Sequence, residues 1–338
     1  MTRASVVLSI AALAIAVAPS ARTHRLEATP STVAYGWYDA AAKPVLTIAS
    51  GDIIDVDTLL TNTPSGLQRA GVPDDQIQAS LKAVVDGVPR EARGPGGHIL
   101  TGPVFVDGAE PGDVLEVRVQ SIELALAYAY NGCSGFLPEN CPEDRSQRTR
   151  IVRLDRAHMI AEFAPGIIIP LRPFFGSMGV APDPAAGRIS SNPPGTHAGN
   201  LDNRLLVAGS TLYIPVHARG ALFEVGDGHA AQGDGEVDQT ALETSLRGRL
   251  QLVVRKDLSL TWPRAETPSE YIAMGTDKDL TVATKTAVQQ MVDFLVQDKH
   301  LTRLAAYQLT SIAGNVVITQ LVDGNVGVHV VMPKSIFR

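Results

Sequence analysis

The chain has 338 residues, with 29 lysines and arginines against 35 aspartates and glutamates, which gives a formal net charge of −6 at pH 7. A mildly acidic chain presents no electrostatic footprint for nucleic acid or an anionic membrane, so we expect neither as a partner. The length is sufficient to bury a large core in one big domain or in two.

Residues 1–21 have the composition of a secretory signal peptide. Arg3 supplies a basic start, and the apolar run from Val6 to Ala18 is too short to span a bilayer permanently. The pattern predicts cleavage near Ala21 and a secreted or periplasmic protein that is not held by a membrane after cleavage. A retained membrane anchor is the alternative interpretation of the same residues.

The first half of the chain after this leader combines strand patterns with one helical excursion. Strands are predicted at residues 45–49, 53–57, 98–106 and 114–122, with Gly, Asp and Pro turn residues around them. In the excursion, apolar side chains recur at helical spacing between residues 73 and 85, after a Pro-Asp-Asp start. The alternation of apolar and polar residues in 114–122 predicts an antiparallel sheet with one covered and one solvated face.

The second half changes character twice. Residues 164–204 are rich in Gly, Pro, Ser and Asn, which predicts a functional loop system and not a linker. Residues 288–296 form a clear amphipathic helix, a second helix is predicted at 302–313, and a hairpin follows at 316–331. Strands early and helices late predict a β-rich or α+β protein and argue against an alternating α/β sheet.

Two cysteines, Cys133 and Cys141, lie close together in a loop that is rich in Gly, Pro and Asn. In an exported protein, such a pair most simply forms a disulfide that closes the loop. Because a disulfide sulfur is not a thiolate, we do not expect a cysteine nucleophile in this chain.

The stretch from Gly226 to Glu236 is the most unusual part of the sequence. It holds four glycines, two aspartates, a histidine, a glutamine, a glutamate and only two alanines. It therefore has little side-chain burial to offer folding, and its glycines carry a large backbone entropy cost. Strand patterns at residues 212–216, 222–225 and 249–254 flank it. We interpret this polar run as a binding or catalytic segment that is positioned by a sheet.

Three groups of polar residues indicate the chemistry of a metal site. His98 begins a predicted strand, Asp202 lies in the Gly-rich loop system, and His229 lies in the polar run. Neutral imidazole with carboxylates and one open position suits zinc or a similar divalent ion, so we predict these three residues as metal ligands. A metal-activated water would attack a carbonyl, and Glu236 and Asp234 are best placed to carry a proton to a leaving nitrogen.

Other patterns limit the alternatives. The polar run could instead hold calcium, although it lacks the alternating ligand spacing of an EF-hand. The sequence has no G-x-S-x-G elbow, no H-E-x-x-H, no P-loop, and no G-x-G-x-x-G between a strand and a helix. The remaining isolated histidines are interpreted as hydrogen-bonded structural residues: His24, His158, His217, His300 and His329.

Five stretches of the chain resemble the acetamidase/formamidase family. They are Thr101–Leu115, Pro173–Val180, Gly199–Asn203, Gly228–Val237 and Gln320–His329. The block His-Ala-Ala-Gln-Gly-Asp-Gly-Glu in the fourth stretch is long and specific. The similarity covers most of the chain beyond the predicted leader.

The resemblance implies a mostly β architecture, with sheets of the β-sandwich or jelly-roll kind, and a smaller α+β C-terminal part. Residues 22–270 are then expected to form the β-rich domain that carries the metal site, and residues 271–338 to pack on the same catalytic unit. The resemblance also implies hydrolysis of short-chain amides to carboxylate and ammonia, and a homo-oligomer. The implied cofactor is a divalent metal, for which we expect zinc, with calcium as the alternative.

The resemblance also identifies candidate residues of the pocket, of which Asn200 and Gln232 are expected to bind the small amide substrate. The full set is His98, Asn200, Asp202, His229, Gln232, Asp234 and Glu236. The leader and the cysteine loop set this chain apart from cytosolic amide scavengers, so a lactam hydrolase of the same family is one alternative. A non-catalytic β-sandwich module that binds calcium and a carbohydrate through the same loops is the other.

Overall fold

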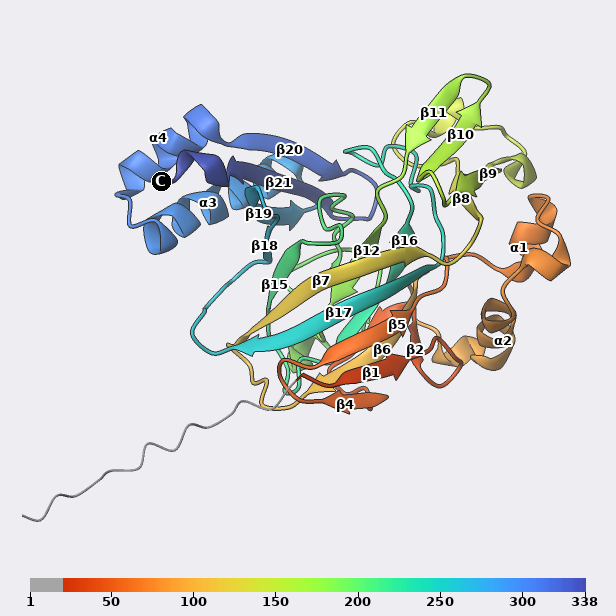
Figure 1. Ribbon diagram of the computed structural model, residues 1–338, viewed down its shortest axis with the longest axis horizontal. Helices are drawn as coiled ribbons and strands as arrows, with labels where there is room; N and C mark the ends of the chain where they lie inside the picture. Colours follow the sequence, from red (N-terminus) through yellow and green to blue (C-terminus); the bar gives the residue numbers. More distant parts are fainter. Residues whose placement is uncertain (1–20) are drawn as a thin grey trace, which may run out of the picture.

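The computed structural model describes residues 21–338, so the predicted signal peptide lies outside the described residues apart from Ala21. Within this range the chain forms a mostly β molecule with two large sheets, two small sheets and four α-helices (Figure 1). The predicted fold class is therefore confirmed.

The largest sheet has nine strands and includes strands from both ends of the described chain. In spatial order the strands are β1 (Thr23–Leu26), β5 (Ile53–Asp57), β17 (Leu246–Arg255), β7 (Val114–Leu124), β15 (Thr211–Pro215), β18 (Arg264–Glu266), β19 (Glu270–Asp277), β21 (Val326–Pro333) and β20 (Asn315–Gln320).

The second large sheet has six strands and carries the candidate site. They are β14 (Ala198–Asn200), β12 (Phe174–Gly179), β16 (Phe223–His229), β6 (Ile99–Val106), β2 (Val33–Tyr35) and, beside β6, β4 (Leu46–Ile48). The small sheets contain β11 (Ile167–Pro170), β10 (Ile160–Ala164), β9 (Thr149–Asp155) and β8 (Tyr128–Gly132), and the pair β13 (Ile189–Ser190) and β3 (Trp37–Tyr38).

The main core lies between the two large sheets. Buried apolar side chains of β5, β7 and β17 share one cluster with those of β6, β12 and β16. The two sheets approach closely, because a Cβ on Gly248 of β17 would lie 2.6 Å from the ring of Phe175 in β12. Covering both inner faces in this way is how a β-sandwich removes its apolar surface from water.

The C-terminal elements continue the nine-stranded sheet and cover it with helices. Helix α3 (Leu280–Asp298) begins after Asp279, whose carboxylate accepts from two backbone amides of the first turn, and the predicted helix at 288–296 is its second half. Helix α4 (Arg303–Ala313) follows, and both helices share an apolar cluster with β19 and β21. The predicted hairpin is formed by β20 and β21. The division of the chain at residue 270 stays a prediction.

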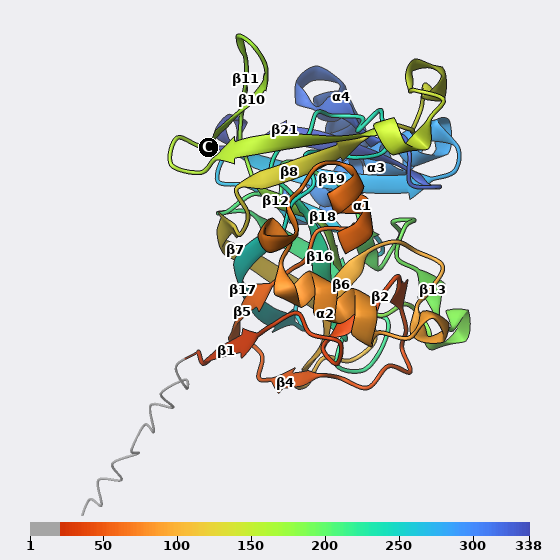
Figure 2. The same ribbon diagram turned by 90° about the vertical axis from the view of Figure 1, so that its right-hand side faces the viewer.

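Two short helices on the other side of the molecule differ from the sequence prediction. Helix α1 (Pro64–Arg69) was not predicted, and helix α2 (Ala79–Gly87) begins later than the Pro-Asp-Asp start, which forms a 3₁₀ turn at Asp74–Gln76. Figure 1 shows α1 and α2 together at the right-hand side of the molecule, and in Figure 2 this side faces the viewer. The buried residues Leu67 and Leu81 attach them to a second apolar cluster, which also contains Ile99 of β6 and Tyr128 of β8.

The prediction of loop throughout residues 164–204 was wrong for part of that range. Strand β12, with the sequence Phe-Phe-Gly-Ser-Met-Gly, is buried along its whole length between β14 and β16. Its glycines disguise it, because glycine is depleted in strand interiors and gives no side chain to the alternation. One of these glycines, Gly176, has a role in the site described below.

The predicted disulfide between Cys133 and Cys141 is present. The loop that it closes is hydrogen-bonded to the segment after the polar run: Ser134 N donates to Asp238 O at 3.1 Å and Phe136 N donates to Val237 O at 2.8 Å. Among the described residues, no helix is both long enough and apolar enough to cross a membrane.

Candidate active site

Polar side chains from distant parts of the sequence meet at one end of the six-stranded sheet. His98 directly precedes β6, Asp202 follows β14, and His229 is the last residue of β16. Glu236 comes from the loop that follows β16. Ligand atoms of Asp202, His229 and Glu236 all lie within 4.8 Å of one another, and all three side chains are buried. The geometric convergence that the sequence predicted for these three residues is therefore present.

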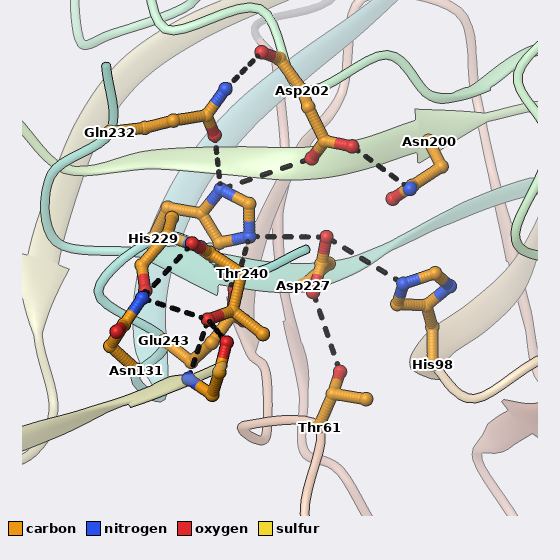
Figure 3. A network of polar contacts seen from close by, with 12 residues as sticks. Thr61, His98, Asn131, Asn200, Asp202, Asp227, His229, Gln232, Thr240 and Glu243 are labelled. Carbon is orange, nitrogen blue, oxygen red and sulfur yellow. Dashed lines mark hydrogen bonds and ion pairs between the residues drawn. The ribbon is translucent and has the colours of Figure 1, made fainter. Parts of the chain in front are cut away.

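His229 lies at the centre of the cluster, and each ring nitrogen faces different groups (Figure 3). Its Nε2 lies 3.2 Å from Asp227 Oδ2 and 3.1 Å from Glu243 Oε1, yet no described residue meets this buried atom with hydrogen-bond geometry. Its Nδ1 lies 2.8 Å from Gln232 Oε1. The Gln232 amide in turn donates from Nε2 to the carbonyl of Asp202 at 2.8 Å, which assigns its oxygen to the ring. The arrangement holds a proton on Nδ1 and directs Nε2 toward the two carboxylates.

Two more of the predicted site residues, Asn200 and His98, lie beside this centre. Asn200 Nδ2 donates to Asp202 Oδ2 at 2.9 Å, whereas the buried Oδ1 of Asn200 has no hydrogen-bond partner in the described part of the chain. His98 Nε2 lies 3.8 Å from Asp227 Oδ2, and its Nδ1 lies 2.9 Å from Ser191 Oγ. His98 thus faces the same carboxylate oxygen as His229.

Gly176 of β12 leaves the space in which the cluster assembles. A Cβ at this position would lie 2.4 Å from Asp202 Oδ1, 2.5 Å from Asp227 Oδ2 and 2.9 Å from His229 Cε1. The φ angle of Gly176 is not in the left-handed region, so glycine is required here for space and not for backbone freedom. Any side chain would displace two carboxylates and the imidazole.

Three of the acidic residues have strained backbones. The φ angles are +48° at Asp202, +55° at Asp227 and +41° at Glu236, in the left-handed region that side chains other than glycine seldom adopt. Strain of this kind persists where the surrounding structure enforces it, and it gathers at functional sites. The surrounding structure therefore holds these three residues in strained backbone conformations, and this orients their carboxylates.

The cluster holds more buried negative charge than its imidazoles balance. Five carboxylates and two imidazoles line or enter one small volume: Asp202, Asp227, Glu236, Glu243, Asp323, His98 and His229. Burial raises the pKa of Asp202, and the charge of Glu236 raises it further. Burial also raises the pKa of Glu236 and of Glu243, and it raises the pKa of Asp323 to about 6.

The pKa values of His229 and Asp227 shift against the effect of burial. Burial alone would lower the pKa of His229, but Glu243 and Asp227 outweigh it and raise this pKa well above its usual range. Burial alone would raise the pKa of Asp227, but His229 and His98 outweigh it and hold this pKa well below its usual range. A positive charge is thus strongly favoured between these residues, and a divalent cation would meet that demand.

A cavity of about 180 Å³ opens beside the cluster and is lined by His98, Asn200, Asp202 and Glu236 together with three acids that carried no predicted role, Asp227, Glu243 and Asp323. Asp234 is not among its lining residues. The Asp234 carboxylate lies 2.7 Å from the guanidinium of Arg204 in a partly exposed ion pair.

Sequence reasoning missed Glu243 and Asp323, and it gave Asp227 no role. Asp227 belongs to the polar run, so its position was a usable signal. Glu243 lies next to His229 and Tyr130 through isolated β-bridges, a pairing between segments that no local spacing reveals. Asp323 lies between β20 and β21, in the connection of the predicted hairpin, where an aspartate is an ordinary turn residue.

Comparison with known proteins agrees with the family resemblance that the sequence shows. The model of the Acetamidase/Formamidase family matches residues 44–189 and 184–338. A formamidase from Methylophilus methylotrophus is 26% identical over 191 residues, a match that covers 41% of this chain and 47% of that protein. The chain thus spans about half the length of the curated relatives that it matches.

Solved structures match over nearly the whole chain. An acetamidase from Bacillus halodurans superimposes with a TM-score of 0.77 at 26% identity and covers 93% of this chain and 98% of its own. An acetamidase from Yersinia enterocolitica gives a TM-score of 0.79 at 25% identity, with 96% of each chain covered.

Proposed function

The chain belongs to the Acetamidase/Formamidase family, and from this premise we propose that it hydrolyses short-chain linear amides to a carboxylate and ammonia with the help of a divalent metal ion. The observation that carries the proposal is the buried Nε2 of His229, which faces two carboxylate oxygens at 3.1 and 3.2 Å without a described hydrogen-bond partner. An imidazole nitrogen and carboxylate oxygens that all face one position, as here, are typical of a metal site.

The residues fit such an ion. His229, Asp227 and Glu243 form one candidate ligand group, and His229 and Asp202 belong to a second, whose third member, Glu236, is given the proton-transfer role below. A mixed imidazole and carboxylate set suits zinc, whereas calcium prefers oxygen ligands alone, so we propose zinc. His98 is kept as a proposed ligand, because it faces the same oxygen of Asp227. When bound, a divalent cation supplies Lewis acidity, which polarises a carbonyl and lowers the pKa of water to near neutrality.

The contacts of the chain's own residues support specific roles in this reaction. Gln232 fixes the tautomer of His229, and its amide is engaged at both ends by residues of the site. Its predicted contact with substrate stays a prediction. Asn200 offers a buried, unengaged Oδ1 at the cavity, which suits the N–H groups of a primary amide. The cavity of about 180 Å³ is below the range of about 300–1,000 Å³ that is usual for drug-sized ligands, so it suits a small amide.

Glu236 is the proposed proton carrier. It is buried, lines the cavity, and its Oε2 has no hydrogen-bond partner among residues 21–338. Water adds to the amide carbonyl carbon, Glu236 accepts the proton from that water, and it delivers the proton to the nitrogen as the C–N bond breaks. Asp234 has its carboxylate committed to Arg204, so the proposal gives it no step.

The first experiment measures ammonia release from formamide and acetamide by the wild type, by Glu236→Gln and by Asp234→Asn. We expect Glu236→Gln to lose about 10²–10⁴-fold in kcat, because proton transfer is removed while the shape of the side chain is retained. Asp234→Asn serves as the matched control and should stay near the wild type. Full activity in Glu236→Gln removes that residue from catalysis.

The same preparation separates the alternatives. Zinc in the purified protein together with ammonia release supports the amidase, whereas calcium with no turnover of any amide supports a carbohydrate-binding module. Including a γ-lactam in the substrate panel tests the lactam hydrolase. Neither alternative has a feature of the described residues that favours it over the amidase.

We also propose that the protein is exported, as its first 21 residues predict. The disulfide between Cys133 and Cys141 supports this, because such bonds persist in oxidising compartments. N-terminal sequencing of the protein recovered outside the cytoplasm would locate the cleavage site. The homo-oligomer implied by the family stays a proposal, which light scattering on the mature chain would test.

A further inference from the structure

A second and larger cavity lies behind the candidate active site. Its volume is about 510 Å³, within the range of about 300–1,000 Å³ that is usual for small-molecule sites. One wall is the β10–β11 hairpin, which projects from the body of the molecule in Figures 1 and 2. The other is the segment 231–242, which leads away from the polar run. Of the described residues, Thr240 alone lines both this cavity and the catalytic one.

The lining of this cavity is mainly apolar. Phe163 and Ile169 face it from the hairpin, and Leu242 faces it from the opposite wall. No role in the proposed amidase reaction explains an apolar surface of this size, because formamide and acetamide have almost no apolar body. An apolar cavity that the fold does not fill is suited to a hydrophobic ligand.

Two guanidinium groups border the apolar surface. Arg172 lines the cavity, and its side chain forms no ion pair or hydrogen bond with any residue between 21 and 338. Arg204 pairs through one terminal nitrogen with Asp234, but its buried Nε has no hydrogen-bond partner among the described residues. Planar N–H donors of this kind recognise carboxylates well.

One acidic residue, Asp238, also lines the cavity and adds a carboxylate to its wall. Asp238 lies on the same wall as Thr240, and its Oδ1 accepts a hydrogen bond from Asn131 Nδ2 at 3.2 Å. Burial raises the pKa of Asp238, whereas its hydrogen bond from Asn131 lowers it. Within residues 21–338, Asp234 already offsets the charge of Arg204, so the donors left for a carboxylate are the unpaired guanidinium of Arg172 and the unpartnered Nε of Arg204.

We propose that this cavity is a binding site for a hydrophobic organic carboxylate, whose apolar body lies against Phe163, Ile169 and Leu242 and whose carboxylate is held by Arg172 and Arg204. The site is separate from the catalytic cavity and shares its wall. Gln232 lines it and is also the residue that orients His229, so the ligand lies one side chain away from the imidazole. The proposal does not depend on the amidase activity.

The experiment is calorimetric titration of the purified protein with octanoate, with octanol as the neutral probe of the same tail and acetate as the short carboxylate. We expect octanoate to bind more tightly than either. Arg172→Gln should weaken octanoate binding at least about tenfold and leave octanol unchanged, because it removes the charge and keeps much of the length. Arg153→Gln, an exposed arginine of β9 outside the cavity, is the matched control and should bind as the wild type does.

Two further variants keep the outcome decisive. Ile169→Trp fills the apolar part and should abolish octanoate binding, with circular dichroism to show that the fold is retained. Glu236→Gln should bind octanoate like the wild type whether or not it hydrolyses amides. Absence of octanoate binding, or binding that is unaffected by Arg172→Gln and Ile169→Trp, overturns the proposal. Loss of binding in Glu236→Gln also overturns it, because the carboxylate would then lie in the catalytic cavity.

Discussion

At Gly176 the absence of a side chain has a direct chemical use, because Asp202, Asp227 and His229 fill the space that a Cβ would take. Two carboxylates and an imidazole can approach one another only over a backbone that offers no atoms in between. A glycine in the middle of a buried strand weakens that strand, and here the gain is a place for the polar cluster.

We therefore expect Gly176→Ala to lose metal and activity while the sheet remains folded. The added methyl would lie 2.4 Å from Asp202 Oδ1 and 2.5 Å from Asp227 Oδ2, so both carboxylates must move. Changes around metal ligands typically cost about 10–100-fold in metal affinity, and we expect at least that. Metal content and kcat/KM are the measurements.

Gly233→Ala provides the matched control for this prediction. No described atom lies within 4 Å of a Cβ at Gly233, so the same methyl should be accommodated without loss. Equal metal content in Gly176→Ala and Gly233→Ala would show that the crowding at Gly176 is relieved in solution.

His329 makes the stability of the protein depend on pH outside the site. It is buried in β21, its Nδ1 lies 2.7 Å from Thr319 Oγ1, and burial lowers its pKa to about 4. Because the unfolded chain has the ordinary value of about 6.5, the native state binds fewer protons between these values. The contribution to stability is therefore present above about pH 6.5 and is lost as the pH falls toward about 4.

We expect unfolding by urea to cost about 2 kcal/mol less near pH 5 than near pH 7.5 on account of this residue. His329→Gln keeps a polar partner for Thr319 and does not titrate, so the pH dependence should shrink by that amount. A variant with the pH profile of the wild type would assign the titration to other groups.

The loop closed by Cys133 and Cys141 acts as a brace for the segment that carries Glu236. Its backbone amides at Ser134 and Phe136 donate to the carbonyls of Asp238 and Val237, which lie two residues and one residue beyond Glu236. This element explains how an otherwise glycine-rich stretch keeps a strained glutamate in place.

Replacing both cysteines by serine should lower the free energy of unfolding by about 2–3 kcal/mol, the loop-entropy value for a short loop. The activity should fall as well, because the Glu236 segment loses its support. Urea denaturation of the double variant, and of the wild type with and without reductant, gives the measurement. An unchanged midpoint in both comparisons would contradict the role as a brace.

Element boundaries could be predicted from the sequence where periodicity and turn residues agree. Strand β7 and the hairpin β20–β21 lie close to their predicted ranges, because apolar alternation and an Asp-Gly turn mark them. Strand β12 could not be predicted, because two of its six residues are glycines and its sequence carries no alternation of apolar and polar side chains. The strand is recognisable only in the folded structure, where β12 pairs with β14 and β16.

The candidate site is a property of the whole molecule, since its residues come from five separate parts of the chain. The sequence identified Asp202, His229 and Glu236 because polar side chains in glycine-rich stretches have no structural explanation of their own. Glu243 and Asp323 could not be predicted, because each lies in an ordinary local context and reaches the cluster through long-range pairing. The presence of an acidic side chain at these two positions is explained only by the folded structure, in which five carboxylates lie together.

Removing the proposed metal ion should therefore affect the stability of the entire fold. A ligand that binds the native state alone stabilises it by about 2.7 kcal/mol at a concentration one hundred times its Kd. We expect a chelator to lower the melting temperature by several degrees and added zinc to restore it. His229→Gln should lack this response. A melting temperature that is insensitive to chelation in metal-loaded protein would argue against an ion among these carboxylates.

The contact between the polar run and the C-terminal hairpin also has a consequence for biosynthesis. Gly235 N donates to Thr319 O at 2.9 Å, Leu321 N donates to Gly235 O at 3.1 Å, and Asp323 contributes to the lining of the catalytic cavity. A ribosome makes Asp202 and His229 long before it makes this hairpin. A nascent chain thus carries an incomplete pocket until β20 and β21 have emerged, and a newly made molecule should acquire the proposed metal ion late, once translation has passed them.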